Sequence, residues 1–401
     1  MNIVSHLSSP EDYNFIKKFS YQFSKENIVC IFVTTNIYMW LLLKMKREKV
    51  YIIKMQNFNK KIEGSFNEKV NYLDNPYIVG DMYYSTMCWC NDFIKKNKVD
   101  LIFIPSGRLI TQKALKDFAE KAKIRTIFIG YGNIPGKTIL DPLGTDKQSS
   151  LYKDCTILDN VNISDKDYRR WYEEYYKEKI KRNTIPQARK INFEFIFKRL
   201  LRTCISKIDN LIKIVHDIDY KFYQIPWKSL NIFNKNVIVH NNTDVKDIKS
   251  NYVFFAMQLS NDTQIIQNYE YDIYTALDEA IKLAKNRNIQ LVVKGHPAEV
   301  DLKVDLHLSQ LEKRGDIILS NSNTFELIEG SDLVIVVNST VGLEAKILDK
   351  EVIFLGDSFF KKLTKEQIKS YVLDYLYDID YFSTEKINDE TYLKIKKRLL
   401  G

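Results

Sequence analysis

The sequence has few cysteines, and they form no pattern. Five cysteines are scattered along 401 residues, and only Cys88 and Cys90 lie close together. A structural zinc site needs a second Cys or His cluster, and no such cluster completes the C-x-C pair. An odd, scattered set in a chain without a signal peptide is typical of reduced thiols in a cytoplasm. We therefore expect no disulfide framework and no metal site.

Long apolar runs are also missing. The most apolar stretch, residues 28–43, is interrupted by Thr34, Thr35 and Asn36, whereas a membrane span needs about 20 apolar residues. The N-terminus has no basic region followed by an apolar run, so we find no secretory signal. We expect a cytoplasmic protein, peripheral at most on the inner face of the cytoplasmic membrane.

Common nucleotide-binding signatures are absent as well. The lack of a Walker loop weighs against a P-loop NTPase. No G-x-G-x-x-G follows the first expected strand of either half, which weighs against a dehydrogenase. Asp-x-Asp pairs begin at Asp165, Asp217 and Asp378, but none follows a suitable strand. We therefore do not interpret them as metal ligands of a single-domain transferase.

Charge is concentrated in one part of the chain. The net charge is +9, and residues 166–207, the basic segment, hold 13 Lys/Arg against 5 Asp/Glu. This excess predicts a surface for an anionic partner such as a membrane, phosphate or a polyanionic glycan, although a solvated helical face is the alternative. No nucleic-acid recognition motif accompanies it, so we expect no nucleic-acid partner. The cations proposed to act are Arg169, Arg170, Lys181, Arg182, Lys198 and Arg199.

Length and patterning predict an α/β fold with two domains. A chain of 401 residues, 45% hydrophobic and 28% charged, is too long for one ordinary core. Short apolar runs alternate with helical patterns, which is typical of parallel sheets covered by helices. We expect strands at residues 27–33, 50–55, 100–105, 125–130, 252–258, 289–295, 316–320, 332–337 and 351–356.

The domain boundaries follow from changes in composition. We expect two Rossmann-like, doubly wound parallel-sheet domains that face a central cleft. The predicted parts are an N-terminal domain at 1–160, a basic helical insertion and linker at 161–245, a C-terminal domain at 246–385 and a C-terminal helix at 386–401.

Polar side chains follow the expected strands of the second domain. Gln258 and Asp262 come after the first strand, Lys294 and His296 after the second, and Asn338 after the fourth. Ligands of open α/β sheets bind beyond the carboxyl ends of the strands. These positions therefore predict a ligand crevice, although each residue alone is also compatible with an ordinary strand end.

The stretch "NSTVGLE", residues 338–344, indicates the kind of ligand. Ser339 and Thr340 are N-cap types, and a helix N-terminus favours an anion such as phosphate. Gly342 would let a ligand approach the backbone. Glu344, one turn further, suits a vicinal diol such as that of ribose, while Lys294 and His296 suit phosphate. Ordinary capping and a salt bridge are the alternatives.

Four blocks in this order resemble the capsular polysaccharide biosynthesis proteins of bacteria, a family that includes retaining β-Kdo transferases. They are "GYGNIPGKTILDPLGTDKQSS" (130–150), "MQLSNDTQI" (257–265), "VVKGHPAE" (292–299) and "VVNSTVGLEAKILDKEVIFLG" (336–356). The resemblance implies a GT-B-like fold with the acceptor side first and the donor side second. It implies a nucleotide-sugar co-substrate such as CMP-Kdo, a lipid-linked or growing glycan acceptor, and no cofactor or metal.

The resemblance also implies functional residues. The residues expected to bind the donor are Lys294, His296, Ser339, Thr340 and Glu344. His296 is also expected to take part in catalysis. The family's Kdo transferases have an acidic residue before the glycine-rich block, whereas this chain has Gly130 and Tyr131 there.

A retaining transferase that forms a covalent intermediate needs a carboxylate nucleophile, and Asp141 is our candidate. A turn aspartate is the alternative, because "DPLG" is a type I turn signature, and Asp146 is a further candidate acid. Asn133, Lys137, Asp146, Gln258 and Asp262 are expected to contact donor or acceptor.

Two other functions compete. A teichoic-acid-type glycerol- or ribitol-phosphate transferase would carry a histidine base in the first domain, where His6, near the terminus, stands alone. A non-catalytic scaffold that retains the nucleotide cleft would explain the missing acid near Gly130.

Overall fold

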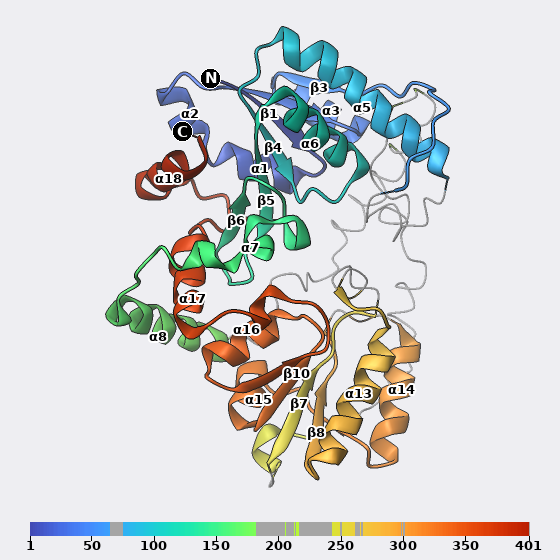
Figure 1. Cartoon of the computed structure of the whole chain (residues 1–401), viewed down its shortest axis with the longest axis vertical. Helices are drawn as coiled ribbons and strands as arrows, with labels where there is room; N and C mark the ends of the chain where they lie inside the picture. The colour runs from blue at the N-terminus through green and yellow to red at the C-terminus, as the bar shows by residue number, and fades with distance from the viewer. Residues whose placement is uncertain are drawn as a thin grey trace. The chain divides into compact units, whose positions relative to one another are not determined.

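The computed structural model describes residues 1–64, 75–181, 205, 212, 214–215, 243–248, 251–260, 265, 268–297, 299 and 301–400. The chain divides into two compact units (Figure 1). The first includes Met1–Asp154 and Asp374–Gly401, and the second includes Cys155–Lys190 and Pro226–Leu373. Residues 374–385 therefore belong with the first unit, whereas the sequence had suggested the second.

The first unit contains a six-stranded sheet in the order β3-β2-β1-β4-β5-β6. Its strands pair in parallel, except that β6 runs antiparallel to β5. The order reverses between β1 and β4, as in a doubly wound fold. The strands are β1 (Asn2–Leu7), β2 (Val29–Thr34), β3 (Val50–Ile52), β4 (Leu101–Pro105), β5 (Arg125–Tyr131) and β6 (Thr138–Asp141).

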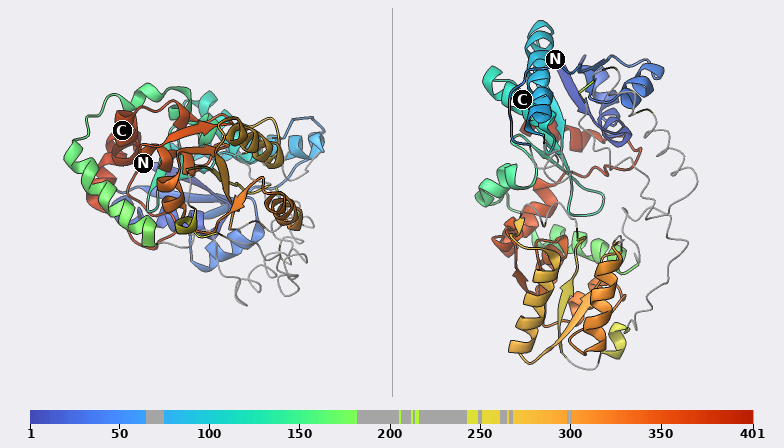
Figure 2. Two further views of the ribbon diagram at one scale, coloured as in Figure 1. Left: turned by 90° about the horizontal axis from the view of Figure 1, so that it is seen from below. Right: turned by 90° about the vertical axis from the view of Figure 1, so that its right-hand side faces the viewer.

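Helices cover both faces of this sheet (Figure 2). One face carries α1 (Pro10–Lys17), α2 (Ser20–Lys25), α3 (Ile37–Met45) and α18 (Asp389–Ile395), and the other carries α5 (Pro76–Lys96) and α6 (Ile110–Ala122). Each face of the sheet forms a hydrophobic core with its helices. Successive residues of β1 point to opposite cores, because Ile3 packs with the first group of helices and Val4 with the second. This alternation is the period of a strand buried on both faces.

The second unit contains a fully parallel sheet in the order β11-β10-β7-β8-β9. Its strand order reverses between β7 and β10. The strands are β7 (Tyr252–Ala256), β8 (Gln290–Lys294), β9 (Ile318–Leu319), β10 (Leu333–Val336) and β11 (Glu351–Phe354). The predicted α/β class with two doubly wound, mainly parallel sheets is confirmed.

The second sheet is also covered on both faces. Helices α13 (Ile273–Asn286) and α14 (Leu302–Lys313) pack on one face, and α15 (Thr324–Gly330) and α16 (Thr340–Ile347) on the other (Figure 1). Two further helices, α8 (Asp165–Lys181) and α17 (Lys365–Ser370), belong to the same unit. Helix α8 begins the basic segment, so the start of the predicted insertion is part of the second unit.

Strand β1 was missed by the sequence analysis, although it is the centre of the first sheet. It contains Ser5 and His6, both fully buried, and these polar residues interrupt the apolar run that marks the other central strands. None of the helices in the described ranges is long and apolar enough to cross a membrane.

Candidate functional site

An amide pair marks the point where the strand order of the second sheet reverses. Gln258 follows β7, and Asn338 follows the neighbouring strand β10. Gln258 Nε2 donates to Asn338 Oδ1 at 3.1 Å, and the Asn338 N–H donates to Gln258 Oε1 at 3.1 Å. Ligands of open α/β sheets bind beside such a reversal. The pair therefore fixes the two strand ends beside which we expect a ligand.

Helix α16 begins at this edge with a cap of the predicted kind. Ser339 has an extended backbone, and its Oγ accepts a hydrogen bond from the Val341 N–H at 3.2 Å. Thr340, the first helical residue, is half-buried. Because α16 directly follows β10, its positive dipole end lies at the carboxyl edge of the sheet, where it favours an anion.

Gly342 has a role different from the one predicted. A Cβ built on this glycine would lie 2.4 Å from a ring carbon of Phe354 on β11 and 2.9 Å from a methyl of Val336 on β10. The missing side chain therefore lets α16 pack closely on the sheet. The side chains of the sheet, and not a ligand, fill the space left by the missing side chain. A contact of the Gly342 backbone with the donor stays a prediction.

Glu344 is a buried carboxylate held by helix α8. It is 4% exposed. Lys179 Nζ lies 2.5 Å from its Oε1, and the Tyr175 hydroxyl donates to the same oxygen at 3.2 Å. Burial and the nearby Glu344 charge raise the pKa of Tyr175, so the phenol stays protonated and donates. The residue predicted to bind a diol is thus one partner of a buried ionic and hydrogen-bonded cluster.

Lys294 ends strand β8 and reaches the loop after β9. Its Nζ donates to the Ser322 carbonyl at 2.6 Å and to Thr324 Oγ1 at 3.0 Å. Burial lowers the pKa of Lys294, the charges of Glu344 and Glu326 oppose that shift, and the charge of Lys179 adds to it. Lys179 and Lys294 are therefore both within electrostatic range of Glu344. His296, two residues further along, is half-buried.

Tyr175 and Lys179 were not predicted from the sequence. Their helix shows an amphipathic signal, because Tyr168, Trp171, Tyr175 and Lys179 recur at helical spacing. That spacing predicts a packed stripe but not the residue that it meets. The partner Glu344 is 169 positions from Tyr175.

Asp262, a predicted contact, lies outside the described residues. The described part of the chain contains no cluster of His, Cys, Asp or Glu suited to a metal.

Asp141, the candidate nucleophile, is fully buried in the first unit. Its Oδ1 accepts from the Leu143 N–H at 2.7 Å and the Gly144 N–H at 3.1 Å. Its Oδ2 accepts from the Ser150 N–H at 2.9 Å, the Ser150 hydroxyl, and the Tyr375 hydroxyl at 2.8 Å. These contacts match the turn alternative, since five donors already occupy the two oxygens.

The other candidates of the first unit lie near the same hairpin. Asp146 accepts hydrogen bonds from Arg108, and its side chain is 27% exposed. Lys137 Nζ pairs with Asp378 at 2.5 Å, so its charge is already partnered. Asn133 is half-buried in the β5–β6 hairpin loop. Asp146 is thus a carboxylate that combines partial exposure with a cationic neighbour.

A known protein family matches this chain. The family model described as "Capsule polysaccharide biosynthesis protein" matches residues 107–367, more than half of the chain. Protein FixF of Sinorhizobium fredii (strain NBRC 101917 / NGR234) is 32% identical over 118 residues, which are 28% of this chain and 28% of FixF. This match spans about a quarter of the length of FixF.

Two transferases are among the solved structures that match this chain. The KpsC β-Kdo 2,7 transferase of Thermosulfurimonas dismutans is 14% identical, with a TM-score of 0.42, and the match covers 99% of this chain and 100% of that one. The KpsC β-Kdo 2,4 transferase of the same organism is 15% identical, with a TM-score of 0.39, and the match covers 76% and 88%.

Proposed function

Since the chain belongs to the capsule polysaccharide biosynthesis protein family, we propose that it is a glycosyltransferase that takes a sugar from a nucleotide-activated donor. CMP-Kdo is the first donor to test, because the matching solved structures are named as β-Kdo transferases. The proposed acceptor is a lipid-linked or growing glycan of a capsule or surface polysaccharide. Transfer is proposed to proceed with retention and without a metal.

One observation supports this proposal most strongly. The buried carboxylate of Glu344 lies in α16, the helix that starts beside the reversal of the second sheet, with Lys179 and Lys294 within electrostatic range. A carboxylate suits the ribose diol, and ammonium groups with a helix N-terminus suit phosphate. Together they match a nucleotide, whose ribose and phosphate are joined.

The chemistry at the leaving phosphate follows from the same residues. As a bond to phosphate breaks, negative charge grows on the leaving group, and donors fixed in advance stabilise it. Lys294, His296 and the N-terminus of α16 are the proposed donors. These groups are positively charged or attract an anion, so the proposed reaction needs no metal ion at the leaving phosphate.

A donor panel tests the proposal. The purified protein is incubated with CMP-, UDP- and GDP-sugars, with and without lipid-linked glycan acceptors, and free nucleotide is measured with and without EDTA. We expect acceptor-dependent release from one donor, insensitive to EDTA. Nucleotide binding without release from any donor would favour the scaffold alternative, and activity on CDP-glycerol or CDP-ribitol would favour the teichoic-acid-type alternative. The full burial of His6 does not favour the latter.

We also propose that the basic segment contacts an anionic membrane or a lipid-linked acceptor. Helix α8 carries six basic and five acidic residues, so most of the positive excess, with Arg182, Lys198 and Arg199, lies outside the described residues. Binding to vesicles with anionic lipid should fall steeply as salt approaches physiological strength, where charges are screened beyond about 8 Å. Salt-independent binding, or equal binding to neutral vesicles, would instead support a solvated helical face.

A further inference from the structure

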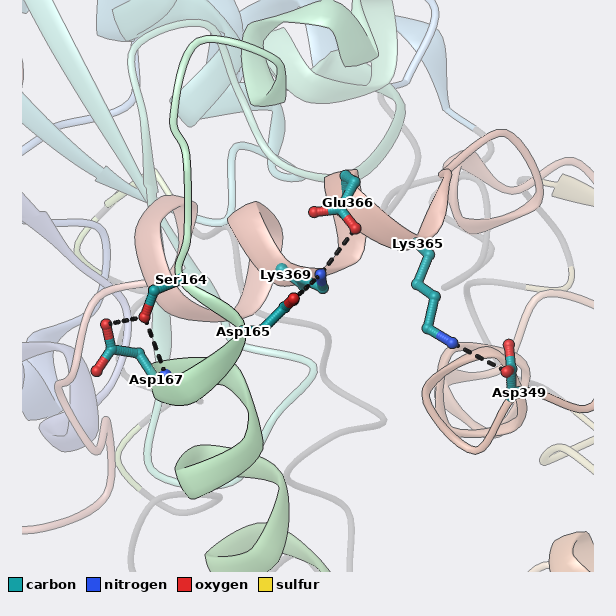
Figure 3. A network of polar contacts seen from close by, with 7 residues as sticks. All are labelled: Ser164, Asp165, Asp167, Asp349, Lys365, Glu366 and Lys369. Carbon is teal, nitrogen blue, oxygen red and sulfur yellow. Dashed lines mark hydrogen bonds and ion pairs between the residues drawn. The ribbon is translucent and has the colours of Figure 1, made fainter.

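Helix α8 is attached to the second unit at both ends. At its start, Lys369 of α17 lies 2.6 Å from Asp165 and 2.7 Å from Glu366, and Ser164 Oγ accepts from the Asp167 N–H at 3.1 Å (Figure 3). At its end, Asn323 Nδ2 donates to the Lys179 carbonyl at 2.9 Å. Contacts at both ends fix the axial position of the helix, and with it the side chains it presents.

The middle of α8 is fixed by aromatic packing. The Trp171 ring stacks on Tyr175 with centroids 5.0 Å apart, and Tyr175 meets Phe325 of α15 edge-on at 5.6 Å. Lys179 Nζ lies 5.7 Å from the centroids of both Tyr175 and Phe325, a cation–π distance. The ammonium is placed by these neighbours, and the Lys179 side chain as a whole is 24% exposed.

The way α8 holds Glu344 leaves part of the carboxylate open. The bonds from Tyr175 and Lys179 both go to Oε1. Within the described ranges no hydrogen bond to Oε2 is found. A carboxylate with one oxygen fixed by the protein is oriented by those contacts and can still accept a diol at the other. The contacts from α8 are therefore compatible with a bound ribose.

Two ammonium groups, Lys179 and Lys294, lie near Glu344, close to the helix end that favours anions. The charge of Glu326 also acts on Lys294. Lys294 has a carbonyl and a hydroxyl as its hydrogen-bond partners, neither of which carries a negative charge. An anionic group bound at this helix end would be attracted by both ammonium groups and by the helix N-terminus, and the phosphate of a nucleotide is such a group.

We propose that Lys179 is a phosphate ligand of the donor site, brought there by α8, and that Tyr175 is a positioning residue that orients Glu344. This inference rests on the proposed function, and it adds to the site two residues that precede the second sheet in the sequence. The phosphate meets the Lys179 ammonium while the ribose diol meets the free oxygen of Glu344. The competing role is a latch, in which Lys179 must leave Glu344 before any nucleoside binds.

The test compares ligands with and without phosphate. Affinities of cytidine and CMP, with uridine and UMP as a second pair, are measured by calorimetry on the full chain. Lys179→Met keeps the apolar stem that packs near Phe325 and removes the ammonium together with its ion pair to Glu344. We expect at least a tenfold loss of CMP affinity, a clearly smaller loss of cytidine affinity, because Lys179 also holds Oε1 of Glu344, and recovery of CMP affinity in Lys179→Arg. Lys177→Met, an exposed lysine of the same helix, is the matched control and should change neither.

Each other outcome contradicts the proposal in a recognisable way. Tighter binding of both ligands by Lys179→Met would identify a latch. An equal loss for both would mean that Lys179 acts on the ribose through Glu344. Unchanged CMP affinity would remove Lys179 from the site. Failure of the wild-type chain to bind any nucleotide would contradict the proposed function itself, whereas the variant comparison bears on this inference alone. Tyr175→Phe should weaken cytidine and CMP equally, which separates orientation of Glu344 from phosphate binding.

Discussion

Glu344→Ala is expected to weaken nucleotide binding by at least tenfold. The carboxylate is proposed to accept hydrogen bonds from a ribose diol in a buried position, and each bond to a charged group contributes about 1.5–3 kcal/mol. Since about 1.4 kcal/mol corresponds to a tenfold change in affinity, the loss of one bond is sufficient. Calorimetric titration with the nucleotide released in the donor panel measures the effect.

The same substitution also leaves Lys179 without its ion-pair partner, so loss of α8 from the second unit must be distinguished from loss of the ligand contact. Glu344→Gln keeps the shape and one acceptor oxygen, and it should give an intermediate affinity. Glu329→Ala is the control. This exposed carboxylate of α15 accepts a hydrogen bond from Tyr176 of α8 at 2.9 Å, so the substitution also removes a contact of α8. If Glu344→Ala folds and binds nucleotide like the wild type, Glu344 has no place in the site.

The second sheet was predictable because its strands are buried on both faces. Such strands are continuously apolar, and "LVIV" and "YVFFA" show this directly as β10 and β7. The polar residues after them were then placed at one edge by the topology of parallel sheets alone. The amide pair of Gln258 and Asn338 and the cap at Ser339 are found at that edge, as the order of residues along the chain had indicated.

Long-range contacts could not be predicted in the same way. Strand β1 escaped notice because Ser5 and His6 interrupt its apolar run, although pairing with β2 and β4 places it at the centre of the first sheet. Gly342 was expected to make room for a ligand, because a single sequence does not show that Phe354 packs against it across the helix–sheet contact. Lys179 and Glu344 are brought together only by the packing of α8 on the second unit. Sequence periodicity predicts which face of a helix is buried, but not the charge that it meets.

Asp141→Ala is expected to destabilise the first unit strongly. The fully buried carboxylate pairs the N–H groups of Leu143, Gly144 and Ser150, although Leu143 itself is exposed. A buried donor left without an acceptor costs about 1–3 kcal/mol. The hydrogen bond from Gly144 is buried and those from Leu143 and Ser150 are part-buried, so the substitution should remove a substantial part of the stability of an ordinary domain. Thermal unfolding followed by circular dichroism measures the loss, and Asp146→Ala, whose carboxylate is more exposed, should show a much smaller one.

The conservative variant Asp141→Asn separates the turn from the nucleophile. An amide keeps Oδ1 for the turn but presents an N–H group to Ser150 and Tyr375, so we expect reduced stability with part of the fold retained. Turnover is then measured per folded molecule at a temperature where the variant is native. If Asp141 is a turn residue, more than a tenth of wild-type turnover should remain, since a tenfold loss corresponds to about 1.4 kcal/mol of activation free energy. A nucleophile cannot be replaced by an amide at so small a cost. A loss of a thousandfold or more in folded Asp141→Asn, with Asp146→Asn active, would restore Asp141 as the nucleophile, whereas the reverse pattern would assign the chemistry to Asp146.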